Sequence, residues 1–123
     1  AEATVSDAIS CAIRRISNVL PVAVLVNYSE SGASTLRAAR ERPTVPILNL
    51  TPNLQTARRL SVAWGVHSVV NDRLRQVDEV CSTALEIAQA QGMAQRGDTL
   101  LITAGVPFGQ PGSTNSLRIE TLI

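Results

Sequence analysis

Two loops in this sequence combine residue types that can hold a small anion. The first, Tyr28–Ser34, contains three serines and Gly32, and the second, residues 105–116, is rich in Gly, Pro, Ser and Thr. Glycine lets a backbone approach a ligand closely, and backbone N–H groups and hydroxyls donate hydrogen bonds to an oxyanion. Because each loop follows a short apolar run typical of a buried strand, we predict that the two loops share one small-anion site.

The first loop also contains the predicted start of a helix. A helix that begins at Ser31-Gly32 presents backbone N–H groups and the positive end of its dipole in its first turn. The hydroxyls of Ser29, Ser31 and Ser34 add donors, so the combination fits a phosphate group. The alternative is that Ser31 only caps the helix and that the second loop is only a turn.

Familiar catalytic motifs are missing from the sequence. Gly32 stands outside any dinucleotide-binding or phosphate-binding glycine motif. All eleven basic residues are Arg, which excludes a Schiff-base lysine or a lysine general base in this chain. The single histidine, His67, lies in a predicted strand, where a structural role is expected, and Glu79 and Glu86 fit a solvated helix face. We therefore expect no catalytic residue here.

Composition narrows the class of protein further. A net charge of +1 gives no electrostatic case for nucleic acid, and three aromatic residues provide no base-stacking platform. No apolar run approaches the roughly 20 residues of a membrane span. The start of the chain lacks a signal-peptide pattern and an initiator Met, so we expect a cytoplasmic chain that is part of a longer protein. Cys11 and Cys81 are both expected to be buried and reduced, and no metal-ligand spacing is present.

The apolar pattern predicts a single α/β domain over residues 1–123. Helix periodicity and strand-like runs alternate, which indicates a doubly wound three-layer α/β/α fold. The sheet is predicted to be five-stranded and mostly parallel, in the order 3-2-1-4-5, with the last strand antiparallel because the loop before it is short. Helices are expected at about 4–20, 32–40, 51–64 and 74–91, and strands at 22–26, 45–50, 66–70, 99–103 and 117–122.

This order places both loops at one end of the sheet. Strands one and four are neighbours, and their connections leave toward opposite faces of the sheet. The crevice outside the carboxyl ends of such strands is where ligands usually bind in α/β folds. Two helix starts are predicted as well: Thr4 as N-cap with Asp7 in the first turn, and Thr51 as N-cap followed by Pro52.

A series of motifs, in order along essentially the whole chain, resembles the C-terminal domain of bacterial pyruvate kinases. The matching residues are Ser29–Gly32, Arg42-Pro43 with Pro46-Ile47, Thr51–Asn53 with Thr56–Arg58, Trp64–Val66, Gly97-Asp98, Ile102–Pro107 and Gly112–Asn115.

The resemblance implies a regulatory domain. A pyruvate kinase transfers phosphoryl from phosphoenolpyruvate to ADP in glycolysis, with Mg²⁺ and K⁺, in a barrel and a lid domain that this chain lacks. The C-terminal domain is implied to bind a phosphorylated effector, to contact its own N-terminal catalytic barrel and to supply a subunit interface in a tetramer. The chain alone is then expected to be inactive and to bind no cofactor of its own.

The resemblance also assigns site residues. The effector loop of the family matches Ser29, Glu30, Ser31, Gly32, Ala33 and Ser34, and its closing loop matches roughly Gly109 to Thr114, including Gly112, Ser113 and Thr114.

Two features depart from the pattern of family members that hold fructose 1,6-bisphosphate. They tend to carry a basic residue where Glu30 stands, and a second one near the last long helix, where no Arg follows Arg75. A carboxylate about 4–6 Å from a phosphate costs roughly 2–4 kcal/mol before screening. A monophosphate or nucleotide effector, or none, is therefore expected.

The sequence leaves two other interpretations of the function open, and it also predicts a subunit interface. The chain could be a free-standing phosphometabolite-binding protein with the same fold or, with least support, an independent small enzyme. In the final strand, at an expected sheet edge, Arg118 and Glu120 alternate with Leu117, Ile119 and Thr121. An antiparallel partner strand could pair these opposite charges across the ladder, so we predict a symmetric dimer through that edge.

Overall fold

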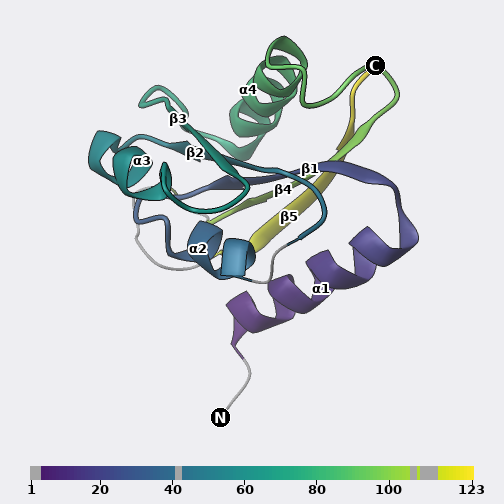
Figure 1. Cartoon of the computed structure of the whole chain (residues 1–123), viewed down its shortest axis with the longest axis horizontal. Coiled ribbons are helices and arrows are strands. Elements are labelled where there is room, and N and C mark those ends of the chain that lie inside the picture. The colour runs from purple at the N-terminus through teal and green to yellow at the C-terminus, as the bar shows by residue number, and fades with distance from the viewer. Residues whose placement is uncertain (1–3, 41–42, 106–107, 109–113) are drawn as a thin grey trace.

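The computed structural model describes residues 4–40, 43–105, 108 and 114–123, with the side chain of Ser6 excepted. Helices and strands alternate within these ranges (Figure 1). In chain order they are α1 (Val5–Val19), β1 (Val22–Tyr28), α2 (Ala33–Arg40), β2 (Ile47–Thr51), α3 (Leu54–Leu60), β3 (Val66–Val70), α4 (Val77–Ala90), β4 (Thr99–Ala104) and β5 (Ser116–Thr121).

The five strands form one sheet in the order β3-β2-β1-β4-β5, as the sequence predicts. The first four strands are parallel, and β5 runs antiparallel to β4. Tyr28, the last residue of β1, is in register with Leu50 of β2 and with Ala104 of β4. The loops that follow β1 and β4 therefore leave the sheet at the same end.

Helices cover both faces of the sheet (Figure 1). Because side chains alternate along a strand, each central strand buries one set of residues toward α4 and another toward α1 and α2. The core on the α4 side includes Val24, Val26, Leu48, Leu50, Leu100 and Ile102, with Val80, Ala84 and Ala88 of the helix. The core on the other side is smaller and includes Val22, Leu25, Ile47 and Leu101, with Ala39 of α2.

The predicted start of α3 is wrong by two residues. Thr51 ends β2 and is fully buried, and Asn53 is the N-cap: its side-chain Oδ1 accepts hydrogen bonds from the backbone N–H groups of Gln55 and Thr56. Thr-Pro is a good helix start by composition, but pairing with β3 holds Thr51 in the sheet. The helix also ends at Leu60, so Trp64, predicted to lie in it, is in the following turn and 57% exposed.

Helix α1 begins as predicted but packs less completely than its pattern suggests. Thr4 caps it, and the Asp7 side chain accepts a hydrogen bond from the Thr4 backbone N–H. This bond is the main reason why the pKa of Asp7 is lowered.

Only Ile13 and Ile16 reach the core from the described side chains of this helix, and Val5 is 60% exposed.

The prediction that both cysteines are buried is wrong for one of them. Cys81 lies in the core on the α4 side, but Cys11 is exposed. Cys11 shares the helical spacing of Arg14, Arg15 and Asn18, so it belongs to the solvent-facing stripe of α1. Within the described residues, no helix has the length and apolar character needed to cross a membrane.

Candidate functional site

The loop between β1 and α2 depends on a glycine that no other residue could replace without strain. Gly32 has a φ of +80°, in the left-handed region that favours glycine. A Cβ atom at this position would lie 2.9 Å from Leu60 Cδ1 and 3.0 Å from Thr56 Cγ2, both on α3. The glycine therefore lets the loop turn sharply and lets α3 pack directly against it.

Side chains of α3 also hold the loop by its carbonyl groups. The Thr56 hydroxyl donates to the carbonyl oxygen of Glu30 at 2.5 Å, and Arg59 Nη2 donates to that of Ser31 at 3.2 Å. Arg59 Nη2 lies 3.1 Å from Thr56 Oγ1 as well. Carbonyl oxygens repel an anion, and these two are already occupied by donors from α3. The backbone N–H groups of the loop are not used by these bonds.

Two serines of the loop accept hydrogen bonds from its own N–H groups. Ser29 Oγ accepts from the Gly32 backbone N–H at 2.9 Å, and Ser31 Oγ accepts from that of Ala33 at 3.3 Å. An oxyanion has the same acceptor character as these hydroxyls and would bind where they do. The serines can then rotate and donate to the anion, because a hydroxyl is both donor and acceptor.

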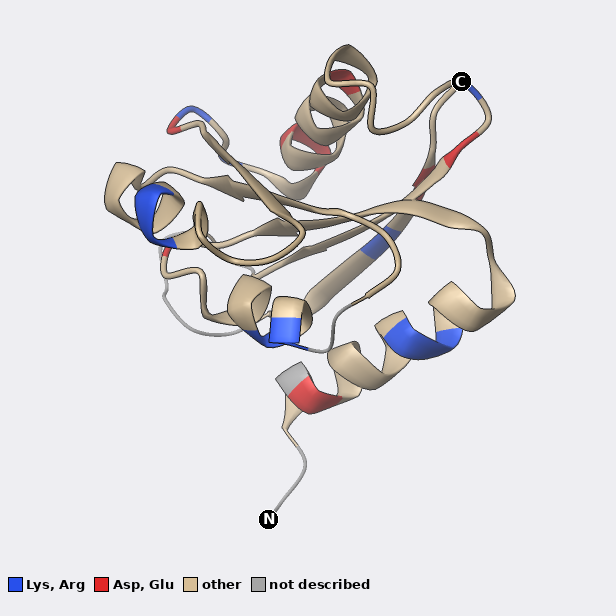
Figure 2. Cartoon of the chain, viewed as in Figure 1, with Lys and Arg blue, Asp and Glu red and all other residues tan. Residues whose placement is uncertain are grey.

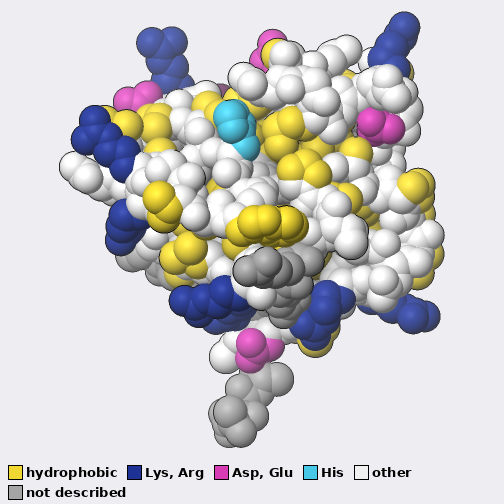
Figure 3. All heavy atoms as spheres, viewed as in Figure 1, with side chains coloured by type: hydrophobic (Ala, Val, Ile, Leu, Met, Phe, Trp, Pro, Cys, Tyr) yellow, Lys and Arg dark blue, Asp and Glu magenta, His cyan; other side chains and the backbone are white. Residues whose placement is uncertain are grey.

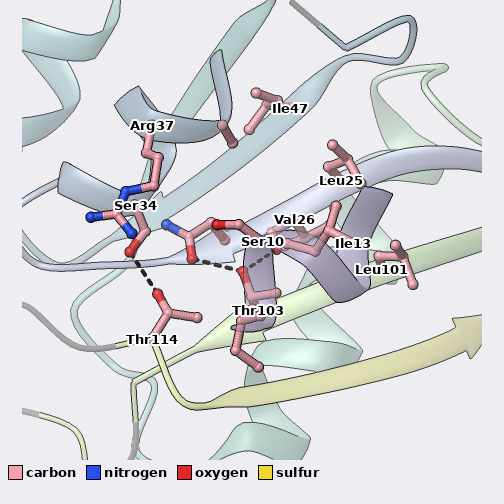
Figure 4. Close-up of a pocket in the computed structure, with 13 residues that line it drawn as sticks. Ser10, Ile13, Leu25, Val26, Ser34, Arg37, Ile47, Leu101, Thr103 and Thr114 are labelled. Carbon is pink, nitrogen blue, oxygen red and sulfur yellow. Dashed lines mark hydrogen bonds between the residues drawn. The ribbon is translucent and has the colours of Figure 1, made fainter. Parts of the chain in front are cut away.

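The two loops predicted to form one site are joined by a hydrogen bond between side chains of the described residues. Ser34 Oγ, in the first turn of α2, lies 2.6 Å from Thr114 Oγ1, just before β5, and the two hydroxyls share a hydrogen bond (Figure 4). Eighty residues separate them in the chain. Of the predicted site residues, Ser29, Ser31, Gly32, Ala33 and Ser34 follow one another at the start of α2, and Ser34 contacts Thr114, whereas Gly112 and Ser113 are outside the described residues.

A buried polar row ties the start of α2 to three strands. Thr103 Oγ1 donates to Asn27 Oδ1 at 2.8 Å, Asn27 Nδ2 donates to Thr35 Oγ1 at 2.8 Å, and Thr35 Oγ1 donates to Asn49 Oδ1 at 2.7 Å. All four residues are buried. Buried polar groups of this kind are costly unless satisfied, and satisfied ones fix geometry. The row therefore fixes the position of the first turn of α2, which holds Ser34.

The predicted site residues do not include this row, although the sequence holds a signal for it. Asn27 and Thr103 each stand next to the last residue of a strand whose other residues are mostly apolar, and Asn49 interrupts β2 in the same way. The register pairs Asn27 with both Asn49 and Thr103. A polar residue at matched positions of three neighbouring buried strands predicts such a row.

Charged groups of both signs act on Tyr28, the first residue of the loop. Tyr28 packs against Phe108, with ring centroids 4.6 Å apart. Burial raises the pKa of Tyr28, the nearby Glu30 carboxylate raises it further, and Arg75 opposes both effects. Arg75 Nη1 donates to the carbonyl oxygens of Asp72 and Leu74.

Two expectations about other residues can be compared with the structure. His67 is exposed on the edge strand β3, apart from this loop, and Figure 3 shows it at the surface beside hydrophobic side chains. Among the described residues, no three His, Cys, Asp or Glu side chains gather closely enough to hold a metal ion.

Comparisons with known proteins identify the family. The family model for the pyruvate kinase alpha/beta domain matches residues 7–120. The chain belongs to this family. Pyruvate kinase from Methylorubrum extorquens is 43% identical over 118 residues, and that from Geobacillus stearothermophilus is 34% identical over 121.

These matches cover 96% and 98% of this chain but only 25% and 21% of the relatives. A structure of Cryptosporidium parvum pyruvate kinase in complex with ADP has a TM-score of 0.87 and 25% identity, covering 99% of this chain and 24% of that one. The chain therefore spans about a quarter of the pyruvate kinases that it resembles.

Proposed function

We propose that this chain is the C-terminal regulatory and oligomerisation domain of a pyruvate kinase, and that it binds a phosphorylated metabolite at the Ser29–Ser34 loop. The observation that carries the binding proposal is the hydrogen bond between Ser34 and Thr114, because it brings together two loops that could surround one anion. A ligand phosphate would accept hydrogen bonds from the N–H groups of Gly32 and Ala33 and from the serine hydroxyls.

The whole enzyme is proposed to transfer phosphoryl from phosphoenolpyruvate to ADP, giving pyruvate and ATP, in the cytoplasm. That chemistry belongs to an N-terminal catalytic barrel, which would be this domain's partner within one chain. Mg²⁺ and K⁺, which the resemblance implies for the whole enzyme, would bind in that barrel. Binding of an effector at the loop would change the activity of the barrel, which is allosteric regulation.

The proposed effector carries one phosphate rather than two. Glu30 follows Ser29 directly, its carboxylate lies close enough to Tyr28 to raise the pKa of that phenol, and its own carbonyl is held by Thr56. A second phosphate near this carboxylate would be repelled. Arg75 is the cation that acts on the same tyrosine, and its carbonyl partners already hold one of its nitrogens.

Calorimetric titration with a sugar monophosphate, fructose 1,6-bisphosphate and inorganic phosphate tests the site. We expect the monophosphate to bind more tightly than the bisphosphate, and Ser31→Ala combined with Ser34→Ala to weaken it by about 1–3 kcal/mol, the loss typical of hydrogen bonds to a charged group. Ser82→Ala, an exposed serine of α4, is the matched control. Equal affinity in the double variant and the control would remove this loop as the site.

A further inference from the structure

A groove lies between α1 and α2, on the face of the sheet opposite α4. It has a volume of about 480 Å³, within the range of small-molecule pockets. Its wall on α1 is formed by residues at helical spacing, Ser10, Ile13, Arg14 and Ser17. The groove exists because α1 reaches the core mainly through Ile13 and Ile16.

The lining of the groove combines an apolar floor with positive charge. Leu25 of β1 and Val45, which precedes β2, contribute to the floor, and Arg14 of α1 and Arg37 of α2 both line the groove. No Asp or Glu is among its described lining residues. Asp7, which is not among the lining residues, forms an ion pair with Arg37: its Oδ1 lies 3.6 Å from Arg37 Nη1.

The surroundings of the groove are positive as well. Figure 2 shows Arg positions in blue on α1 and α2, whereas α4 on the other face of the sheet has acidic positions in red. Arg14, Arg15, Arg37 and Arg40 are the described cations of the two helices, against the single carboxylate of Asp7. This asymmetry favours an anionic occupant.

The groove continues inward to a small cavity with a mainly apolar lining. The cavity has a volume of about 50 Å³ and shares Ser10, Ile13 and Arg37 with the groove (Figure 4). Its inner wall includes Ser34 and Thr114. Arg37 thus stands between the groove and the Ser34–Thr114 pair, one helical turn from Ser34.

We propose that the groove between α1 and α2 binds an organic anion that carries a carboxylate or phosphate group on a short apolar body. The anionic group binds Arg37 and Arg14, since guanidinium groups pair with the planar or tetrahedral oxygens of such groups. The apolar body covers Leu25, Val45 and Ile13 and removes their surface from water. This site is separate from the proposed phosphate loop and does not depend on it.

Titration of the ¹⁵N-labelled chain, followed by amide chemical shifts, tests the proposal with four probes. Octanoate and octyl phosphate, each below its micelle concentration, carry both features and differ in the anionic group. Octanol lacks the charge, and inorganic phosphate lacks the apolar body. We expect saturable shifts in α1 and in residues 43–45 with octanoate, octyl phosphate or both, and at least about tenfold weaker binding of octanol and inorganic phosphate there.

Variants assign the contacts. Arg14→Gln and Arg37→Gln are each expected to weaken the better probe by about tenfold, the size of one lost charged hydrogen bond. Arg15→Gln is the matched control, because Arg15 neighbours Arg14 in α1 but does not line the groove. Asp7→Asn should strengthen binding, because it removes the carboxylate beside Arg37 and keeps an oxygen that accepts from the Thr4 N–H.

Several outcomes would overturn the proposal. Octanol binding as tightly as octanoate and octyl phosphate, or equal loss in Arg15→Gln and Arg37→Gln, would exclude the charge pairing. Probe-induced shifts confined to residues 31–34 would assign the ligand to the phosphate loop instead. Concentration-dependent shifts of α1 without any probe would show that a second copy of the chain fills the groove. The Ser31→Ala, Ser34→Ala double variant should bind the probe normally, so the two proposals fail independently.

Discussion

At the scale of single residues, Gly32 limits what the candidate loop can tolerate. Its positive φ penalises any side chain, and a Cβ would also press against Thr56 and Leu60. We predict that Gly32→Ala lowers the free energy of unfolding by about 2–4 kcal/mol, from backbone strain plus overpacking. Urea denaturation measures this loss.

Gly92→Ala is the matched control for this substitution. Gly92 has a φ of +72°, close to that of Gly32, but nothing lies within 4 Å of the place that a Cβ would take. The control should therefore lose only the backbone part, about 1 kcal/mol. Equal losses at the two positions would mean that contact with α3 does not constrain the loop.

Tyr28 reports on the charges beside the same loop. It is the single tyrosine of the chain, so the ultraviolet absorbance of tyrosinate follows it alone. Burial and Glu30 raise its pKa above the ordinary value of 10.0, and Arg75 opposes them. We predict that Glu30→Gln lowers this pKa and that Arg75→Gln raises it, with Glu86→Gln on α4 as an inert control.

The same shift sets the direction of the stability change at high pH. The folded state holds the Tyr28 proton more tightly than the unfolded state, so stability falls as the pH rises from about 10 through the folded pKa. Glu30→Gln should reduce that fall. An unchanged Tyr28 titration in both variants would place Glu30 and Arg75 away from the phenol.

At the scale of elements, α1 can be tested through its exposed stripe. Cys11 is exposed, whereas Cys81 lies on the buried face of α4, and burial raises the pKa of its thiol while Arg118 opposes that effect. Only the thiolate is a strong nucleophile. We predict that maleimide modifies Cys11 rapidly in the native chain and Cys81 only after denaturation, as peptide mass spectrometry would resolve.

Cys11→Ser should abolish the fast reaction without changing the slow one. Reaction of both thiols at similar rates in the native chain would mean that the face of α4 with Cys81 is not packed against the sheet, or that α1 turns a different face to solvent. The result bears directly on the groove, because Arg14 belongs to this stripe and also lines the groove.

Elements are easier to predict from this sequence than the contacts between them. The strands and their order follow from continuous apolar runs separated by helical patterns, and the meeting of the two loops follows from that order. The start of α3 could not be read from Thr51-Pro52, because pairing with β3 decides it. The bond from Arg59 to Ser31 and the exposure of Cys11 depend on how helices dock, which local pattern does not specify.

At the scale of the whole molecule, the proposal that catalysis belongs to a separate barrel domain gives a direct prediction. The chain spans about a quarter of its relatives, and the proposed catalytic barrel lies outside it. The purified chain should therefore show no turnover of phosphoenolpyruvate and ADP with Mg²⁺ and K⁺. The full-length gene product should show it, and its intact mass would separate a domain of a larger enzyme from a free-standing binding protein. Turnover by the chain alone would contradict this assignment.

The last prediction concerns self-association through β5, which forms one edge of the sheet. The sequence predicts that Arg118 and Glu120 pair with a partner strand, but Arg118 binds Glu120 at 2.8 Å and Asp78 of α4 at 3.0 Å within the chain. What remains for a partner is the backbone edge and Ile119, which is 47% exposed. An unpaired edge with an apolar side chain favours pairing with a second copy.

We therefore predict a symmetric dimer that Ile119→Pro dissociates by removing a backbone donor, and that Ile119→Lys weakens by placing a charge at the edge. Val70→Lys is the matched control, because Val70 is a 43% exposed apolar residue on β3, the opposite edge. Sedimentation velocity measures the mass, and circular dichroism verifies that each variant is folded. A monomer at high micromolar concentration, or a dimer lost equally in Val70→Lys, would rule out β5 as the interface. If only the β5 variants dissociate the dimer, the two copies join their sheets edge to edge through β5.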